Sequence, residues 1–232
     1  MASSQCCDKP PMLNPASGEG KLVDSFGGLK TYLAGSDKSK AAVILISDVF
    51  GFEAPNLRKI ADKVASFGYF VVVPDFFHDD AYMPENAERS LKTWLESQTP
   101  VWPIDKCVLD QNSAKVAVEL SKAYLIEAAV LLHPTFVTVD DMTEVRCPIS
   151  VLGAEIDKIS PPELVKQFEK VLLENSAVGH FVMIFPGAKH GWSVRYRHDD
   201  AVAVKRAEEV LTDMIGWFNK YLNLTLKLKP SL

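Results

Sequence analysis

The sequence predicts an α/β fold with a mostly parallel sheet flanked by helices. Short, continuous apolar runs recur along the chain, and such runs are typical of strands that are buried on both faces. Segments with apolar residues at helical spacing separate them, and a strand–helix–strand order implies a right-handed parallel unit. The apolar runs lie at residues 42–47, 69–73, 127–133, 147–153 and 181–185.

The composition is that of an ordinary globular protein with one large core. Of 232 residues, 47% are hydrophobic and 24% are charged, which is typical of globular chains. The net charge of −5 gives no general attraction to nucleic acid or to anionic membranes. No apolar run is long enough to span a bilayer, and no secretory signal follows Met1. We therefore expect a cytoplasmic protein, a monomer or a weak homo-oligomer, with free thiols at its four cysteines.

Three parts of the chain are distinguished by composition. Residues 1–20 are rich in proline and glycine and are predicted to form a loop-like leader. Residues 21–222 are predicted to form a single domain, because strand and helix patterns follow one another there with only short interruptions. Residues 223–232 form a C-terminal tail that the pattern does not assign.

The first half of the domain predicts a hairpin and a parallel unit. Residues 21–34 alternate in polarity around Gly27-Gly28, which is a hairpin signal. After the apolar run at 42–47, residues 57–65 place apolar side chains on one face of a helix, and Gly68 ends it. The strand at 69–73 then ends at Pro74.

The second half continues the alternation of helices and strands. Residues 84–98 and 104–124 read as helices that flank a proline-rich interruption. Ser160 to Glu163 has the spacing of a capping box, with proline at the first helical position, and predicts the start of another helix. A long terminal helix is predicted from about residue 204 to residue 221.

Two chemically competent residues follow the last two predicted strands. Asp157 comes after the run at 147–153, and His190 comes after the run at 181–185. Residues just past the carboxyl ends of parallel strands lie where open α/β sheets bind ligands. Their order, acid and then base, is that of the last two members of an α/β-hydrolase triad, in which the acid orients the histidine. We predict that Asp157 and His190 form such a pair.

The nucleophile of such a triad is not recognisable. It belongs on a sharp turn with two glycines four residues apart and a serine or cysteine between them. Among the twelve glycines only Gly187 and Gly191 have that spacing, and Lys189 is between them. The sequence therefore contains an acid and a base without a recognisable nucleophile turn.

Other polar residues near strand ends allow two interpretations. Asp48 and Glu53 follow the strand at 42–47, where hydrolases place an oxyanion-hole loop, but a solvated loop is equally consistent. Arg195 has the chemistry to bind a substrate carboxylate, or it pairs with Asp199 or Asp200 on the surface.

No cofactor and no metal are expected from the motifs. The other histidines lack the spacing of metal ligands, and no G-x-G-x-x-G motif follows a strand.

Four segments resemble the dienelactone hydrolase family, and most closely its plant members, some of which carry a glucanase-like name. This family of carboxylic ester hydrolases includes carboxymethylenebutenolidases, and the resemblance covers about residues 5–222. The segments are 74–77 (Pro-Asp-Phe-Phe), 131–134 (Leu-Leu-His-Pro), 153–162 (Gly-Ala-Glu-Ile-Asp-Lys-Ile-Ser-Pro-Pro) and 185–192 (Phe-Pro-Gly-Ala-Lys-His-Gly-Trp).

The resemblance implies a function and a set of site residues. Family members are α/β-hydrolases that open small lactones or esters with a Cys-Asp-His triad, so a small ester or lactone is the implied ligand. By position, Asp157 and His190 match the acid and the base, and Asp48 matches an acidic residue near the nucleophile. The remaining matches, all implied for oxyanion or substrate binding, are Val49, Trp192 and Arg195.

The chain departs from the family pattern before Lys115. Family members read like Gly-Phe-Cys-Trp-Gly-Ala-Lys before the segment that begins here at Lys115, whereas this chain has Asp-Gln-Asn-Ser-Ala at 110–114, with Gln111 in the nucleophile's place. The nucleophile strand and its turn are thus predicted to be absent, and Cys107 or Ser113 would be a replacement lying within a continuous helix. We expect an impaired hydrolase; a non-catalytic binding protein and a truncated isoform without stable activity are the alternatives.

Loss of that strand has a structural consequence. In the family it lies between the strands at 42–47 and 128–132, so its absence leaves two facing rows of backbone groups without partners. Backbone groups left open in this way favour pairing with another strand, including a strand of another chain. Two outcomes are open: the sheet closes by direct pairing of 42–47 with 128–132, or the family frame is kept with a gap between these strands. We expect closure, or an unstable fold.

Overall fold

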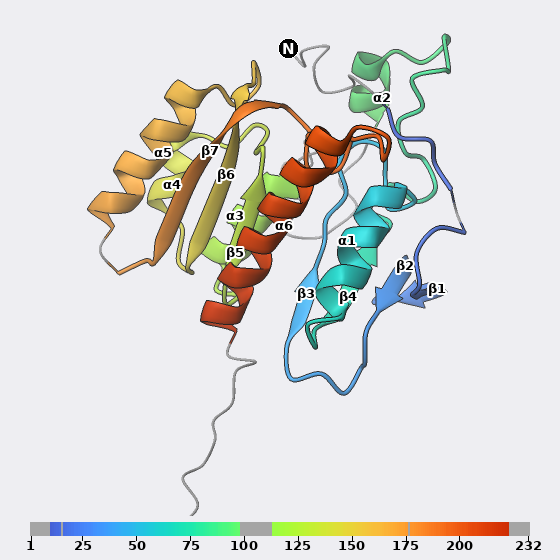
Figure 1. The fold of residues 1–232 in the computed structure, drawn as a ribbon, viewed down its shortest axis with the longest axis horizontal. Helices are drawn as coiled ribbons and strands as arrows, with labels where there is room; N and C mark the ends of the chain where they lie inside the picture. Colours follow the sequence, from blue (N-terminus) through green and yellow to red (C-terminus); the bar gives the residue numbers. More distant parts are fainter. Residues whose placement is uncertain (1–9, 15, 98–112, 176, 223–232) are drawn as a thin grey trace, which may run out of the picture.

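The computed structural model describes residues 10–14, 16–97, 113–175 and 177–222, and their strands form two sheets (Figure 1). The first sheet has the order β1-β2-β4-β3, and the second has the order β5-β6-β7. The strands are β1 (Lys21–Phe26), β2 (Leu29–Ala34), β3 (Ala42–Ile44), β4 (Phe70–Pro74), β5 (Ala129–Leu132), β6 (Ile149–Ile156) and β7 (His180–Lys189).

Strand direction separates the hairpin from the rest of the molecule. β1 pairs antiparallel with β2, and β2 pairs antiparallel with β4. The pairs β3–β4, β5–β6 and β6–β7 are all parallel. The helices that connect or flank them are α1 (Pro55–Ala65), α2 (Leu91–Ser97), α3 (Ser113–Lys122), α4 (Val139–Thr143), α5 (Pro162–Glu174) and α6 (Ala201–Tyr221).

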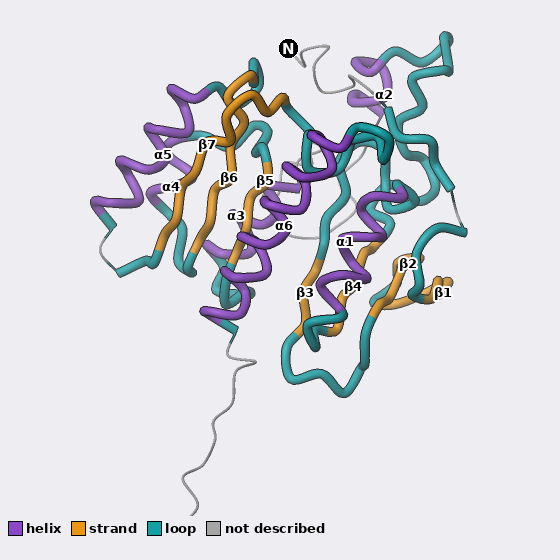
Figure 2. Tube along the Cα trace, in the orientation of Figure 1, coloured by secondary structure: helices purple, strands orange, loops and turns teal. Residues whose placement is uncertain are grey.

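Helices cover both faces of the sheets (Figure 2). Alternate residues of β5 show which helix lies on which face: Val130 packs into the cluster that contains α1 and α6, and Leu131 packs into the cluster that contains α3 and α5. This alternation is the period of a strand that is buried on both sides. It explains why the strand sequences are continuously apolar.

Most of the predicted elements are confirmed, including the hairpin and the parallel unit β3–α1–β4. The predicted helix at 84–98 is wrong in its first half, because α2 begins only at Leu91. The Asn86 side chain accepts from the Glu88 amide, and such local bonds compete with a helix. The Ser90 hydroxyl accepts from the Thr93 amide, which is how a residue caps a helix that starts after it.

Two further expectations concern helix starts. The capping box at 160–163 is wrong: Pro161 precedes the first residue of α5, and no side chain caps it. The Ser160 amide donates instead to Asp157, so this segment is shaped by the acid at the end of β6. Of the helix predicted at 104–124, only α3 falls within the described residues; residues 104–112 lie outside them, as does the tail at 223–232.

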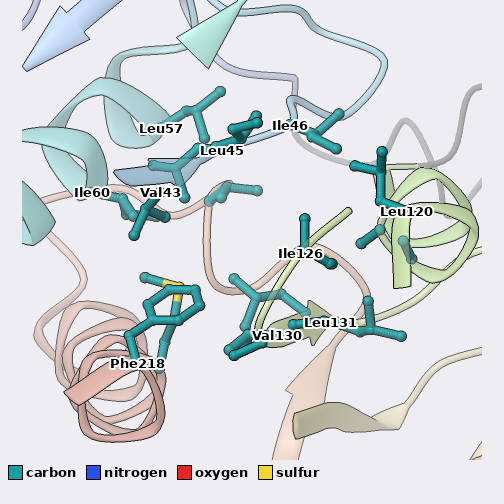
Figure 3. A pocket seen from close by; sticks show the side chains of 18 of the residues that line it. Val43, Leu45, Ile46, Leu57, Ile60, Leu120, Ile126, Val130, Leu131 and Phe218 are labelled. Atoms are coloured by element: carbon teal, nitrogen blue, oxygen red, sulfur yellow. The ribbon is translucent and has the colours of Figure 1, made fainter. Parts of the chain in front are cut away.

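A cavity of about 610 Å³ lies between the two sheets, at the position where a strand was predicted to be missing. β3 and β5 are the facing edges, and among the described residues no strand lies between them. Figure 3 shows Val43 of β3, Val130 of β5 and Leu45, the residue after β3, around this space, with Leu120 of α3 and Phe218 of α6 beside them.

The expected closure of the sheet by pairing of 42–47 with 128–132 is therefore wrong. The reason lies in α6, which packs on both sheets. Phe218 belongs to the same cluster as Val43 and Val71, against which Val130 also packs, whereas Val210 packs with residues of β6 and β7. Direct pairing of β3 with β5 would require one half of the molecule to move under this helix and to give up part of its packing against α6.

A charged cluster fixes α3 on the opposite face. The Asp141 carboxylate, at the start of α4, accepts hydrogen bonds from Lys115 and from Lys122, the latter at 2.9 Å. It also accepts from the Thr138 amide, which completes a capping box. Burial works to raise the pKa of Asp141, but the hydrogen bonds from the two lysines outweigh it and hold that pKa well below its usual range.

We expect Asp141→Asn to lower the free energy of unfolding by about 1–3 kcal/mol, because it removes the more buried of the two carboxylates, Asp141 and Glu119, that both lysines share. Since the folded-state pKa is depressed, this contribution is present above the unfolded pKa of Asp and is lost as the pH falls below it. Urea unfolding at pH 7 and at pH 3 measures both effects. The neighbouring Asp140 is exposed, so Asp140→Asn is the matched control and should change stability by less than about 0.5 kcal/mol. Equal effects of the two substitutions would contradict this role.

Candidate active site

Asp157 and His190 meet at the carboxyl edge of the second sheet. Asp157 follows β6 and His190 follows β7, and these strands are parallel neighbours, so both residues emerge at the same edge. The His190 Nδ1 atom lies 2.8 Å from the Asp157 Oδ2 atom, and the side chains are only 3% and 0% exposed. The predicted contact between them is thus present, and their catalytic role stays a prediction.

The second oxygen of Asp157 is held by the backbone. Its Oδ1 atom accepts from the amides of Ile159, at 2.8 Å, and of Ser160, at 3.0 Å. These bonds fix the carboxylate plane before it contacts the ring. Because Nδ1 of His190 faces this acid, Nε2 is the ring atom from which a proton can be exchanged with a reactant.

His133 is a third residue of the site, and the spacing of histidines gave no reason to include it. It follows β5, and its ring lies edge-on to that of His190, with centroids 4.8 Å apart. Its Nε2 atom lies 2.9 Å from the Ser193 hydroxyl. The strand-end argument that selected Asp157 and His190 would also have selected His133, since it comes directly after an apolar run.

Arg195 is buried beside Asp48 rather than exposed. Its Nε atom lies 3.7 Å from the Asp48 Oδ2 atom, with the arginine side chain 3% exposed and the aspartate side chain 24% exposed. The alternative of a surface pairing with Asp199 or Asp200 is wrong; Arg197 makes that contact with Asp199. Burial raises the pKa of Asp48 above its ordinary value, although the Arg195 cation works in the opposite direction.

The loop after β3 is compact. The Asp48 carboxylate accepts from the Phe50 amide and its carbonyl accepts from the Gly51 amide, so the segment is a tight turn. Val49 is buried, and its carbonyl accepts from the Tyr82 amide. Glu53 is half-buried and, in contrast to Asp48, does not line the cavity. The oxyanion role implied for Val49 stays a prediction.

Trp192 forms an aromatic wall on the same edge. Its indole lies 5.3 Å from the Phe185 ring and 5.4 Å from the His133 ring, measured between centroids. With an exposure of 8% it shields the histidines from solvent. A role in contacting substrate remains a prediction from its position.

No thiol or hydroxyl of the described residues is held against His190. Asp157 is the one described residue that hydrogen-bonds its ring, and Ser193 is engaged by His133. Cys147 is buried before β6 begins, at the far end of that strand from Asp157. Gln111 and Cys107 lie outside the described residues, and Ser113 is the first residue of α3.

Two classes of feature are not found in the described part of the chain. No group of three or more histidine, cysteine or acidic side chains is placed to hold a metal ion within the described residues. None of the described helices is long and apolar enough to cross a membrane.

His133 leads to a prediction about pH. Burial, and then the proximity of His190 and Arg195, lowers its pKa well below the ordinary value, so the folded protein keeps this ring neutral. An unfolded chain protonates histidine near pH 6.5, so it binds more protons below that pH, and stability is lost as the pH falls. We expect this residue to account for a loss of up to about 2 kcal/mol between pH 7 and pH 5.

Unfolding of His133→Asn measured across this range should show a flatter pH dependence. Asparagine tolerates the positive φ of 39° found at His133. His78→Asn is the matched control, because His78 is exposed and also has a positive φ, of 52°. An unchanged slope in His133→Asn would contradict the assignment.

Comparison with known proteins identifies the family. Its family model, described as the dienelactone hydrolase family, matches residues 29–118 and 112–222. The two matches meet at 112–118, where the nucleophile segment was expected to be missing.

Individual relatives agree with this match. An endo-1,3;1,4-beta-D-glucanase of Zea mays is 40% identical over 198 residues, which cover 76% of this chain and 64% of the maize protein. The matched part of this chain thus spans less than two thirds of that relative. A carboxymethylenebutenolidase homolog of Mus musculus is 30% identical over 217 residues, covering 84% of this chain and 88% of the mouse protein.

Solved structures share the fold. A candidate dienelactone hydrolase of Klebsiella pneumoniae aligns with a TM-score of 0.62 at 15% identity, covering 87% of this chain and 98% of that one. An esterase of Pyrococcus furiosus aligns with a TM-score of 0.56 at 15% identity, covering 92% and 98%. The fold, the two matched stretches and the relatives agree, and the chain belongs to the dienelactone hydrolase family.

Proposed function

We propose that this chain is a member specialised for small esters or lactones that keeps the acid–base pair but is impaired in the covalent step. The observation that carries the proposal is the buried contact of 2.8 Å between His190 and Asp157, with no described thiol or hydroxyl held at the same ring. The pair alone supplies proton transfer, whereas covalent catalysis also needs a nucleophile in reach of the base.

The chemistry of the incomplete site follows from this geometry. In a complete triad the histidine takes the proton of the nucleophile as it attacks the ester carbonyl, and the buried acid stabilises the imidazolium that forms. Here Asp157 is positioned for its part, and Nε2 of His190 is the proton acceptor. Because no described residue presents a nucleophile to this atom, attack falls to water, which no nucleophile turn positions, and the gain in rate from positioning is lost.

Stabilisation of the oxyanion is also reduced. The hole in this fold combines one amide from the loop after the first parallel strand with one from the residue that follows the nucleophile. The turn at Asp48 and Val49 supports the first contribution. The second belongs to the segment for which the described chain has no counterpart between β3 and β5.

A non-catalytic ligand-binding role is the second candidate. The observation that favours it is that Asp48, Arg195 and His133 all line the cavity between the sheets, so polar groups gather at one place in a mostly apolar lining. This arrangement fits a small ester or lactone with a carbonyl or a carboxylate at the polar end. A truncated isoform without stable activity is the third reading, and the interrupted family match supports it.

We infer a cytoplasmic monomer or weak homo-oligomer that uses no cofactor and binds neither nucleic acid nor membrane. The negative net charge supports the last two points.

We expect ester hydrolysis near background. Turnover of p-nitrophenyl acetate by the full chain should lie within about twofold of that by His190→Ala, because removal of a triad member leaves only weak residual catalysis. His180→Ala is the matched control, since His180 lies at the opposite end of the same strand, β7.

Alkylation of the thiols with iodoacetamide should leave the rate unchanged. Steady turnover that both His190→Ala and alkylation abolish, but His180→Ala does not, would show that a cysteine outside the described residues acts as the nucleophile. A chain that melts without a cooperative transition would instead support the truncated isoform.

A further inference from the structure

The outer side of β7 is an open strand edge. β7 is the last strand of the second sheet, and no described strand pairs with it on the side away from β6 (Figure 1). The Gly179 carbonyl accepts from the Ile149 amide of β6. Because successive residues of a strand direct their backbone groups to opposite sides, the groups of His180, Val182 and Ile184 point away from β6. These three residues can therefore bond a further strand.

This edge lacks the features that protect the other strand edges. β1, the outer strand of the first sheet, carries Lys21 and Asp24 and is irregular between Val23 and Phe26. The two edges at the cavity belong to strands of only three and four residues. Charges, bulges and short strands keep sheet edges from associating. β7, in contrast, has ten residues and carries no charge over 181–188.

Two large apolar side chains are exposed beside the open edge. Phe181 is 41% exposed and Met183 is 38% exposed. Both lie on the face of α6, where the Phe181 ring is 6.5 Å from the Trp217 ring between centroids. Val182 and Ile184 point to the other face and pack into the cluster that contains α5. An apolar patch next to open backbone groups is the kind of surface that pairs with another strand.

We propose that β7 pairs with β7 of a second copy of this chain, antiparallel and about a two-fold axis at Val182, to form a weak homodimer with one continuous sheet. The limits of the open edge set this register. The Val178 amide already donates to the Asn175 carbonyl, and Pro186 has no amide hydrogen to give. Val182 is midway between these limits, so an axis there pairs all the open groups of residues 180–184.

The register also covers the exposed side chains. Val182 faces Val182 of the second copy, and His180 faces its Ile184; residues opposed in this way exchange both backbone bonds. Phe181 then faces Met183 of the second copy, in the closer type of cross-strand pair, where side chains contact each other. Because each copy uses the same surface, the assembly closes at two copies.

The direction of α6 relates its charges to this axis. Arg206, in the second turn of α6, donates to the Gly187 carbonyl of β7 at 3.2 Å. Trp217, near the end of α6, contacts Phe181, near the start of β7. The helix therefore runs antiparallel to the strand beneath it. A two-fold axis at Val182 consequently brings the last turns of α6 in one copy toward the middle turns of α6 in the other.

The charges on these turns are opposite in sign. Lys220, in the last turns, lies over the Trp217 ring, 5.5 Å from its centroid. Asp213 is one turn before Trp217, and burial, followed by the nearby Glu209 carboxylate, raises the pKa of Asp213 above its ordinary value. The axis directs Lys220 of each copy toward Asp213 of the other. A parallel pairing in register would instead place each charge beside its own counterpart.

The size of the patch indicates a weak dimer. A large side chain has about 150–250 Å² of surface, so Phe181 and Met183 together expose roughly 150 Å² in each copy. This is far below the roughly 800 Å² that each partner buries in a stable complex. We expect a dissociation constant on the order of 10–100 μM. Hydrolysis plays no part in this inference, so its test is independent of the proposed function.

Sedimentation of the full chain over about 5–500 μM measures this constant. Met183→Lys places a charge at the open edge, opposite Phe181 of the second copy, and should raise the dissociation constant at least about tenfold. Leu22→Lys is the matched control, because Leu22 is 42% exposed on the outer strand of the other sheet. It should leave the constant within about twofold of the parent value.

A charge exchange tests the register. Lys220→Glu and Asp213→Lys should each raise the dissociation constant at least about threefold, because each brings like charges together across the axis. The double variant should return to within about twofold of the parent, since the opposite charges are then restored. Lys38→Glu, at an exposed loop position, is the control and should have no effect.

Three outcomes overturn the proposal. The first is a parent chain that stays monomeric up to about 500 μM. The second is an equal effect of Met183→Lys and Leu22→Lys, which would move the contact away from β7. The third is a double charge variant that dimerises no better than the single variants, which would exclude the axis at Val182. If Met183→Lys loses its cooperative melt, the charge exchange decides.

Discussion

The packing of α6 against both sheets is the constraint on which the rest of the structure depends. Phe218 packs in the cluster of β3 and β4, and Val210 packs with residues of β6 and β7. The two sheets are thereby held at a fixed separation, although no backbone hydrogen bond of the described residues joins them. The same packing keeps the carboxyl ends of β5, β6 and β7 near the turn at Asp48, and so assembles the site.

The acid and the base of the site are held in place by contacts of their own. Asp157 and His190 are held by neighbouring strands and by the backbone of the segment after β6, none of which depends on the nucleophile strand. Their contact is also a buried hydrogen bond between polar groups, and such bonds are costly to break whatever their use. An intact pair therefore indicates family membership, but it does not by itself indicate catalytic turnover.

The polar groups around the pair follow the same logic. His133 is neutral when buried next to His190, and Arg195 is buried beside the half-buried Asp48. A neutral His133 ring avoids the cost of burying an imidazolium ion. The Asp48 carboxyl group beside Arg195 offsets part of the cost of burying the guanidinium ion. The lining of the cavity beside them is mostly apolar, and Asp48, His133 and Arg195 provide a defined place in it for a small polar group.

The sequence by itself determined the α/β class, the hairpin, the parallel strands and the pair Asp157 and His190, because apolar period and strand-end position are local properties that the chain carries along its length. Tertiary structure alone decided the rest. The burial of Arg195 and the contact of His133 with His190 join residues far apart in the sequence. The open gap between β3 and β5 depends on how α6 packs across both sheets, which no local pattern encodes.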